Sequence, residues 1–202
     1  MRIGILVFDG AEELDVVGPW EVFAASRLLR SSGDTGGADD DLISIAPTTG
    51  AVRCAKGMRI LPDHTIAEHP ALDVLVVPGG QGTRTLVHDE AVITWIARTA
   101  TTCSWVTSVC TGALLLHEAG PARGRRVATH WGFEDALADR GDVTVVSDER
   151  WVVDGNLVTS QGVSAGIDMA LWLIGRWHGP DHSRAVRRWI QYDPAPPYAD
   201  EP

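Results

Sequence analysis

Residues 74–82 read Val-Leu-Val-Val-Pro-Gly-Gly-Gln-Gly, and a helical pattern at 90–99 separates them from a second apolar run at 103–109. A strand, a turn, a helix and another strand in this order form a βαβ unit. Parallel strands that are buried on both faces read as continuous apolar runs, and their crossover connections are helices. The stretch therefore predicts a mostly parallel sheet with helices on both faces.

The same alternation continues on either side of this unit. Residues 2–8 form a short apolar run that ends at Asp9-Gly10, and Gly18-Pro19 predicts a helix over 20–30, with Asp15 in the connection before it. Its expected inner stripe is Val22, Phe23, Ser26 and Leu29. Further strands are expected at 42–46, 52–54, 58–61, 127–129, 143–146, 151–153 and 157–159, and further helices at 111–118, 131–139, 165–177 and 182–190. We expect one α/β domain over 1–202, with a solvated loop at 31–41 and a Pro-rich tail from about 193.

Composition narrows the class of protein and of ligand. With 45% hydrophobic and 22% charged residues, the chain has the composition of a globular protein rather than a disordered or fibrous one. Seventeen Lys and Arg against 27 Asp and Glu give a net charge of −10, which repels polyanions. We therefore expect a small-molecule ligand, and neither nucleic acid nor a membrane as partner.

The chain shows no sign of membrane insertion or secretion. Its longest apolar runs, such as 74–77 and 170–174, are far shorter than the ~20 residues that span a bilayer. Acidic residues follow the first apolar run where a signal peptide would continue. Three cysteines without a secretion signal argue against a disulfide scaffold. We expect a cytoplasmic protein.

Ligands of open parallel sheets collect outside the carboxyl ends of the strands. Four segments of this chain follow a predicted strand and carry suitable groups: Asp15, residues 79–82, residues 109–112 and His130-Trp131. Cys110 lies where a strand passes directly into a helix, an arrangement that exposes a nucleophile beside backbone N–H donors. The helix N-terminus favours a reactive thiolate there. The alternative is a small buried core cysteine.

Five motifs in register resemble the ThiJ/PfpI superfamily. They are Gly4-Ile5-Leu6-Val7-Phe8, Leu14-Asp15-Val16-Val17-Gly18-Pro19, Pro78-Gly79-Gly80, Thr107-Ser108-Val109-Cys110-Thr111-Gly112 and Ala128-Thr129-His130-Trp131-Gly132. Residues 163–168 and the tail at 192–198 are further similar to the isonitrile hydratases of that superfamily. The resemblance implies a flavodoxin-like three-layer sandwich of the class I glutamine amidotransferase type, and a dimer.

The resemblance also implies an activity and its residues. An isonitrile would be hydrated to an N-substituted formamide through a covalent thioimidate, by a hydro-lyase that needs no cofactor. Cys110 would attack the isonitrile carbon, Asp15 would supply and later remove the proton, and Thr111 would steady the thiolate. Gly80 and Gln81 would offer backbone donors across the pocket, and His130 would be a further substrate-binding residue.

Two of these residues have alternative interpretations. A carboxylate close to a thiolate cannot cheaply stay charged, so Asp15 and Cys110 should share one proton. Asp15 is also a suitable helix cap. His130 invites a Cys-His dyad, but in the protease-like members the histidine directly follows the cysteine, and Thr111 stands there in this chain. Trp131 is interpreted as a packing residue.

The remaining polar motifs are assigned structural roles. The pairs His64 with His69 and His178 with His182 lack a full set of ligands at metal spacing, so no metal is expected. Residues 79–82 match neither dinucleotide nor P-loop glycine patterns. Two arginine clusters are interpreted as solvated surface: Arg123, Arg125 and Arg126, and Arg184, Arg187 and Arg188. Some of the eight tryptophans are expected to cover the interface of a homodimer.

Two other functional classes remain open. One is a different cysteine enzyme of the same fold, such as an amidase, a glyoxalase-like hydratase or a deglycase. The other is a non-catalytic sensor module related to AraC-type regulators, which would need a DNA-binding partner chain. Cys54 and Cys103 are expected to be structural, and Cys110 is expected to be oxidised before either of them.

Overall fold

The fold is built on a seven-stranded sheet, seen in a computed structural model that describes residues 1–31 and 40–193. The strand order is β10-β11-β7-β6-β1-β2-β5. These strands are β1 (Arg2–Leu6), β2 (Asp41–Ala46), β5 (His64–Thr65), β6 (Val74–Val77), β7 (Trp105–Val109), β10 (Trp151–Asp154) and β11 (Leu157–Ser160). Only β10 runs antiparallel to its neighbour in this sheet. The mostly parallel sheet predicted from residues 74–109 is confirmed.

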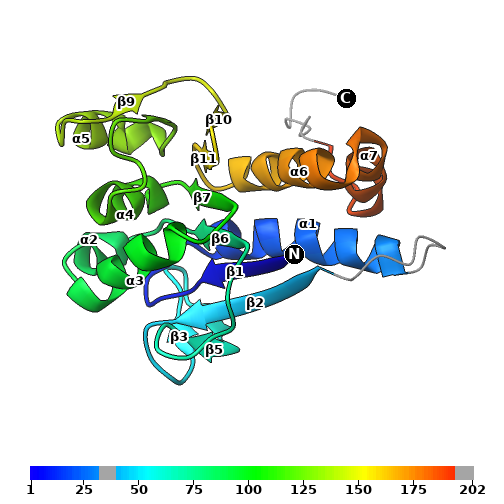
Figure 1. Cartoon of the computed structure of the whole chain (residues 1–202), viewed down its shortest axis with the longest axis horizontal. Coiled ribbons are helices and arrows are strands. Elements are labelled where there is room, and N and C mark those ends of the chain that lie inside the picture. Colours follow the sequence, from blue (N-terminus) through cyan, green and yellow to red (C-terminus); the bar gives the residue numbers. More distant parts are fainter. Residues whose placement is uncertain (32–39, 194–202) are drawn as a thin grey trace, which may run out of the picture.

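Helices form a layer on each face of this sheet (Figure 1). The connection from β1 to β2 and the connection from β6 to β7 run in opposite directions along the sheet, and right-handed crossovers therefore place their helices on opposite faces. One layer holds α1 (Glu13–Ser31), α6 (Ala165–His178) and α7 (Pro180–Trp189). The other holds α2 (Thr83–Leu86), α3 (Glu90–Ala100) and α4 (Gly112–Ala119). The flavodoxin-like three-layer sandwich is confirmed.

Short elements complete the chain. The hairpin of β3 (Val52–Arg53) and β4 (Arg59–Ile60) is antiparallel, and β8 (Arg126–Val127) pairs with β9 (Thr144–Val145) in parallel. A 3₁₀ turn, η1 (Trp131–Phe133), precedes α5 (Glu134–Ala138). Two short elements, β5 and α2, were not predicted, because His64-Thr65 is not an apolar run and the four residues of α2 are too few to show a helical period.

The core lies between the central strands and the two helix layers. All four residues of β6 are fully buried, as are Ile5 and Leu6 of β1, which accounts for their unbroken apolar sequence. On α1, Val22, Phe23 and Ser26 are buried and Leu29 is partly buried, as the predicted stripe requires.

Helix α1 begins earlier than predicted, so Asp15 lies inside the helix. The helix starts at Glu13 and contains Pro19, so Asp15 lies in its first turn rather than in the connection before it. Glu13 and Asp15 favour that start because negative charge is stabilised at a helix N-terminus. Gly18 serves packing rather than termination, since a Cβ there would lie 3.0 Å from Ile167 Cγ1 of α6.

Two predicted segments fall partly or wholly outside the described residues. Of the loop predicted at 31–41, Ser31 belongs to α1 and Asp41 to β2, and residues 32–39 lie outside the description. The Pro-rich tail lies outside it from residue 194. Among the described helices, none has the length and apolar character required to cross a bilayer.

Candidate active site

Cys110 occupies a tight turn between β7 and α4. Its φ of +58° is in the left-handed region, which a non-glycine residue adopts only when its surroundings hold it there. The Cys110 N–H donates to Ser160 O of β11 at 3.1 Å, and its carbonyl accepts from Thr129 Oγ1 at 2.9 Å. A Cβ on Gly112 would lie 2.1 Å from Val77 O, so the turn also packs directly against β6. Neighbouring strands therefore fix the direction of the thiol.

Asp15 faces this turn from the first turn of α1, and its side chain is fully buried. Its Oδ2 accepts the Gly79 N–H at 2.9 Å. Its Oδ1 has no partner of regular hydrogen-bond geometry, but the Cys110 thiol is close enough to lower the pKa of the carboxyl by hydrogen bonding. The structure thus brings together Asp15 and Cys110, which lie 95 positions apart in the sequence.

Burial makes both groups costly to charge, and the Asp15 charge adds to that cost for Cys110. Burial raises the pKa of Asp15 from 3.8 to about 7, and Glu12 adds to the rise, while the Gly79 N–H, the thiol and Lys56 oppose it. Burial and the Asp15 charge raise the pKa of the Cys110 thiol to about 12, against donors from Thr111. Above about pH 7 the pair therefore holds one proton and one negative charge.

This corrects the expectation of an exposed thiol with a low pKa. Cys110 is only 6% exposed, and the loss of hydration destabilises a thiolate there more than the N-terminus of α4 stabilises it. The Asp15 carboxylate can instead take the thiol proton when a ligand carbon is placed against the sulfur. The resulting acid and thiolate carry the same total charge as the resting pair.

Thr111 and the turn after β6 surround the sulfur. Both the N–H and the hydroxyl of Thr111 lower the pKa of Cys110, as donors to a developing thiolate do. The Thr111 Oγ1 in turn accepts from the Gly80 N–H at 3.0 Å and from Thr83 Oγ1 at 3.2 Å. The Gly80 N–H is therefore occupied inside the protein, and it is not a free donor for a ligand, contrary to expectation. Gln81 is exposed at the next position of the turn.

His130 follows β8 and caps η1, and among the described residues no hydrogen bond joins it to Cys110. Its Nδ1 accepts the Gly132 N–H at 3.2 Å, so in the neutral ring Nε2 carries the proton. Its ring lies 5.5 Å from that of Trp131 and 6.2 Å from that of Phe133. Trp131 is 77% exposed, so its assignment as a packing residue was wrong.

The other cysteines are buried at separate places. Cys54 lies in the β3–β4 hairpin, and Cys103 Sγ donates to Leu72 O at 3.5 Å. Burial raises the pKa of both thiols, that of Cys103 to about 11. Over residues 1–31 and 40–193 all cysteines are free, and no group of three or more His, Cys, Asp or Glu side chains is arranged to hold a metal ion.

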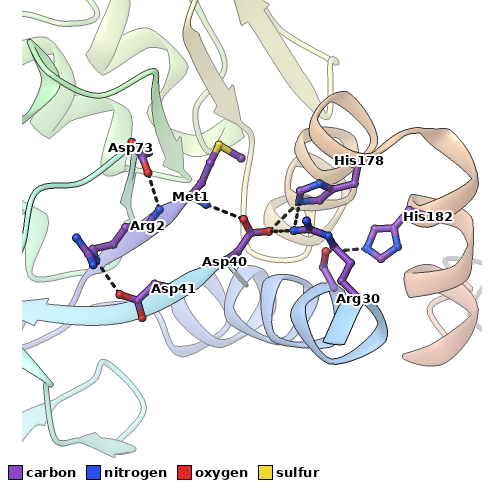
Figure 2. Close-up of polar contacts among 9 residues, drawn as sticks. Met1, Arg2, Arg30, Asp40, Asp41, Asp73, His178 and His182 are labelled. Carbon is purple, nitrogen blue, oxygen red and sulfur yellow. Dashed lines mark hydrogen bonds and ion pairs between the residues drawn. The ribbon is translucent and has the colours of Figure 1, made fainter. Parts of the chain in front are cut away.

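A second polar cluster lies at the opposite end of the sheet and accounts for one of the histidine pairs (Figure 2). Asp40 precedes β2 and is contacted by the Met1 amino group at 2.8 Å, Arg30 Nη1 at 3.0 Å and His178 Nε2 at 2.8 Å. His182 Nε2 lies 2.8 Å from Ser26 Oγ. These contacts tie the ends of α1 and α6 and the start of α7 to the amino ends of β1 and β2.

Several residues around Cys110 were not singled out from the sequence as members of the site. Thr83, Thr129 and Ser160 support the nucleophile turn through hydroxyl or carbonyl groups, yet each is an ordinary residue at or near the end of a short element. A general search of the positions that follow each strand would have found Ser160 and Thr129. Lys56 and Glu12 meet only because the β3–β4 hairpin folds back on the segment before α1.

The geometry defines a class of protein: a flavodoxin-like α/β domain with a cysteine at a strained strand-to-helix turn and a buried carboxyl beside it. The chain belongs to the DJ-1/PfpI family, whose model matches residues 1–176.

Three relatives show the breadth of this similarity. The chain is 37% identical over 198 residues to isonitrile hydratase of Pseudomonas putida, covering 98% of this chain and 81% of that one. It is similar to the crystal structure of a ThiJ/PfpI family protein from Pseudomonas syringae, with a TM-score of 0.87 and 29% identity over 98% of this chain and 77% of that one. It is also 33% identical over 142 residues to the HTH-type transcriptional regulator GbdR of Pseudomonas aeruginosa, covering 70% of this chain but only 38% of the regulator.

Proposed function

We propose that this protein hydrates isonitriles to N-substituted formamides, with Cys110 as nucleophile and Asp15 as proton carrier. The observation that carries the proposal is the buried pair of Cys110 and Asp15, which shares one proton at neutral pH. The 37% identity to an isonitrile hydratase across nearly the whole chain supports the same reaction. No cofactor enters this chemistry, and the working unit is proposed to be a homodimer.

The first half of the reaction adds the thiol to the isonitrile carbon. Asp15 takes the Cys110 proton, the sulfur forms a bond to the terminal carbon of R–N≡C, and Asp15 returns the proton to that carbon. The carbon–nitrogen triple bond becomes a double bond, which gives the thioimidate Cys–S–CH=N–R. The Thr111 N–H and hydroxyl stabilise charge on the sulfur, and the Gly79 N–H holds the carboxylate in place.

The second half releases the product with water. The Asp15 carboxylate accepts a proton from water as the water oxygen adds to the thioimidate carbon, and it passes this proton to the nitrogen. The carbon–sulfur bond then breaks, the proton of the new hydroxyl group passes by way of Asp15 to the sulfur, and the formamide R–NH–CHO departs. The sum is one isonitrile plus one water, with no oxidant or reductant.

The test is formamide production from cyclohexyl isonitrile by purified protein, followed by chromatography. We expect turnover by the wild type and none by Cys110→Ala or Asp15→Asn, because each variant removes one member of the pair. Cys103→Ala is the matched control, since it removes a buried thiol at the other end of β7 and should retain turnover. Formamide production by Cys110→Ala would overturn the mechanism, and its absence in the wild type would overturn the function.

The regulator relative favours a second candidate, a sensor domain that binds an effector without turnover. It matches 70% of this chain. Calorimetric titration with the isonitrile distinguishes the two, because a sensor binds it reversibly and leaves it unchanged. Lactate formed from methylglyoxal faster than formamide from isonitriles would instead assign the pair to a glyoxalase-like reaction.

A further inference from the structure

Two oppositely charged side chains lie at the carboxyl end of the sheet, outside the pair used in the reaction. Lys56 of the β3–β4 hairpin forms an ion pair through Nζ with Oε1 of Glu12, which stands just before α1. The Glu12 side chain is 16% exposed and that of Lys56 is 68% exposed. Lys56 therefore reaches a mostly buried carboxylate from the solvent side.

The hairpin that carries Lys56 is fixed on the segment that leads to Asp15. Four hydrogen bonds of 2.6–2.8 Å join them: the Gly10 N–H to Arg53 O, the Arg53 N–H to Asp9 Oδ1, the Ala55 N–H to Ala11 O and the Lys56 N–H to Glu13 Oε1. The position of Lys56 over Glu12 is thus set by backbone contacts and not only by its own flexible side chain.

Glu12 and Asp15 are held by the same residue of the turn after β6. The Glu12 N–H donates to Gly79 O at 2.9 Å, and the Gly79 N–H donates to Asp15 Oδ2 at 2.9 Å. A Cβ on Gly80 would lie 2.3 Å from the Glu12 N, so the turn packs directly on Glu12. The Glu12 backbone and the Asp15 carboxyl group are therefore both held against the turn after β6.

The charged surroundings of Asp15 come from few elements. Glu12 raises the pKa of both Asp15 and Cys110, and Lys56 lowers that of Asp15. Cys110 faces Asp15 from the turn after β7, whereas the turn after β6 offers the backbone N–H of Gly79.

The other neighbouring groups make contacts of their own, and the charged ones among them are Glu13, which interacts with Lys56, and Arg84, whose Nη1 donates to Gly80 O at 2.8 Å. Glu13 accepts from hairpin amides, and α6 meets α1 through the apolar Ile167 beside Gly18. The ring of His130, after β8, is held by the Gly132 N–H.

We propose that Glu12 and Lys56 are positioning residues that set the proton affinity of the Asp15–Cys110 pair. The Glu12 charge favours the protonated Asp15 carboxyl, and the ion pair with Lys56 offsets that effect and keeps the pair reactive near neutral pH. This inference rests on the pair assigned above as the reactive centre. Its test does not need an isonitrile.

The experiment measures the rate at which iodoacetamide alkylates Cys110 at pH 5–10, with peptide mass spectrometry to separate Cys110 from Cys54 and Cys103. The rate should rise with pH through an inflection. Lys56→Met should move this inflection to higher pH by about 0.5 to 1 pH unit, because the Glu12 charge is no longer offset. Glu12→Gln should move it to lower pH by a similar amount. The double variant should lie between the two single variants, close to the wild type, because the Glu12 and Lys56 charges act on Asp15 in opposite directions.

Two controls separate charge from structure. Lys56→Arg keeps the positive charge and should retain the wild-type inflection. Arg184→Met removes a similarly exposed cation from an ion pair on α7, at the far end of the molecule in Figure 1, and should leave the inflection unchanged. A faster rate at every pH with an unmoved inflection in Lys56→Met would mean that the hairpin only covers the site, which overturns the proposal.

Parallel assays of formamide production separate this inference from the proposed function. Shifted inflections without any formamide would support the role of Glu12 and Lys56 and overturn the hydratase assignment. Formamide production with unshifted inflections in both single variants would overturn the role of Glu12 and Lys56 and leave the hydratase assignment in place.

Discussion

At the scale of single residues, Asp15 combines a cost in stability with its proposed role in chemistry. Its pKa rises from 3.8 in the unfolded chain to about 7 in the folded one, so the folded state binds the proton more tightly. The stabilisation that comes from binding this proton is present below pH 4 and is lost as the pH rises through 7. At neutral pH the buried carboxylate beside Cys110 therefore lowers the stability of the folded protein.

Asp15→Asn should consequently be more stable than the wild type at pH 8, although the proposed function expects it to be inactive. An amide can still accept the Gly79 N–H and carries no charge to desolvate. The difference in unfolding free energy should grow between pH 4 and 7, to at most about 4 kcal/mol. Urea unfolding of both proteins across that range measures it. A difference that does not change with pH would mean that Asp15 is not buried as a titrating group.

The rate of the proposed reaction should rise with pH through about 7 and then level off. Below this value Asp15 and Cys110 are both protonated, so no base is available to take the thiol proton. The measurement is kcat/KM for cyclohexyl isonitrile between pH 5 and 9. A rate that falls with rising pH over this range would show that Asp15 acts first as an acid.

Mild peroxide should oxidise Cys110 before Cys54 or Cys103. All three thiols are buried, but the Asp15 carboxylate beside Cys110 can take its proton and the Thr111 donors stabilise its thiolate. Peptide mass spectrometry after brief exposure ranks the three sites. Earlier modification of Cys54 would contradict the assignment of Cys110 as the reactive thiol.

At the scale of elements, the Asp40 cluster joins helices and strands that are distant in sequence. Contacts to Met1, Arg30 and His178 replace the lost hydration of Asp40. Burial raises the pKa of its carboxyl, but the Met1 amino group and His178 outweigh burial and lower that pKa. Its contribution to stability is present above about pH 4 and is lost as the pH falls through the lowered pKa.

Asp40→Asn should destabilise the protein by about 2 kcal/mol at pH 7, because it leaves the partly buried cations of Met1 and Arg30 without their counter-charge. Asp41→Asn is the matched control, since its partner Arg2 lies on the surface, and it should cost less than about 1 kcal/mol. Thermal or urea unfolding of the two variants gives the comparison. Equal losses would mean that the cluster in Figure 2 behaves as a surface ion pair.

At the scale of the whole molecule, we expect a homodimer of about twice 21.7 kDa. Large apolar side chains are exposed over several described elements, among them Trp131 at 77%, Leu61 at 74% and Trp189 at 57%. Aromatic residues in particular are enriched at subunit interfaces. Light scattering coupled to size exclusion at micromolar concentration tests the expectation. A mass of one chain at every concentration would contradict it.

The fold was largely predictable because burial on both faces leaves a direct mark on sequence. The runs at 74–77 and 103–109 predicted β6 and β7, and most helices appeared within a few residues of their expected bounds. The predicted start of α1 was wrong because Gly18 and Pro19 resemble the residues of a helix start. In the structure they lie inside the first turns of α1, and Gly18 packs against α6. No local pattern distinguishes these two arrangements.

The sequence by itself determined the class of fold, the family resemblance and the choice of Cys110, Asp15 and Thr111 as candidate site residues, since these depend on periodicity and on motifs within short stretches. Only the tertiary structure decided that Cys110 is buried, that its pKa is raised, that the Gly80 N–H is occupied by Thr111, and that Lys56 meets Glu12. The physical reason is that desolvation and charge interactions depend on distances between residues far apart in the chain.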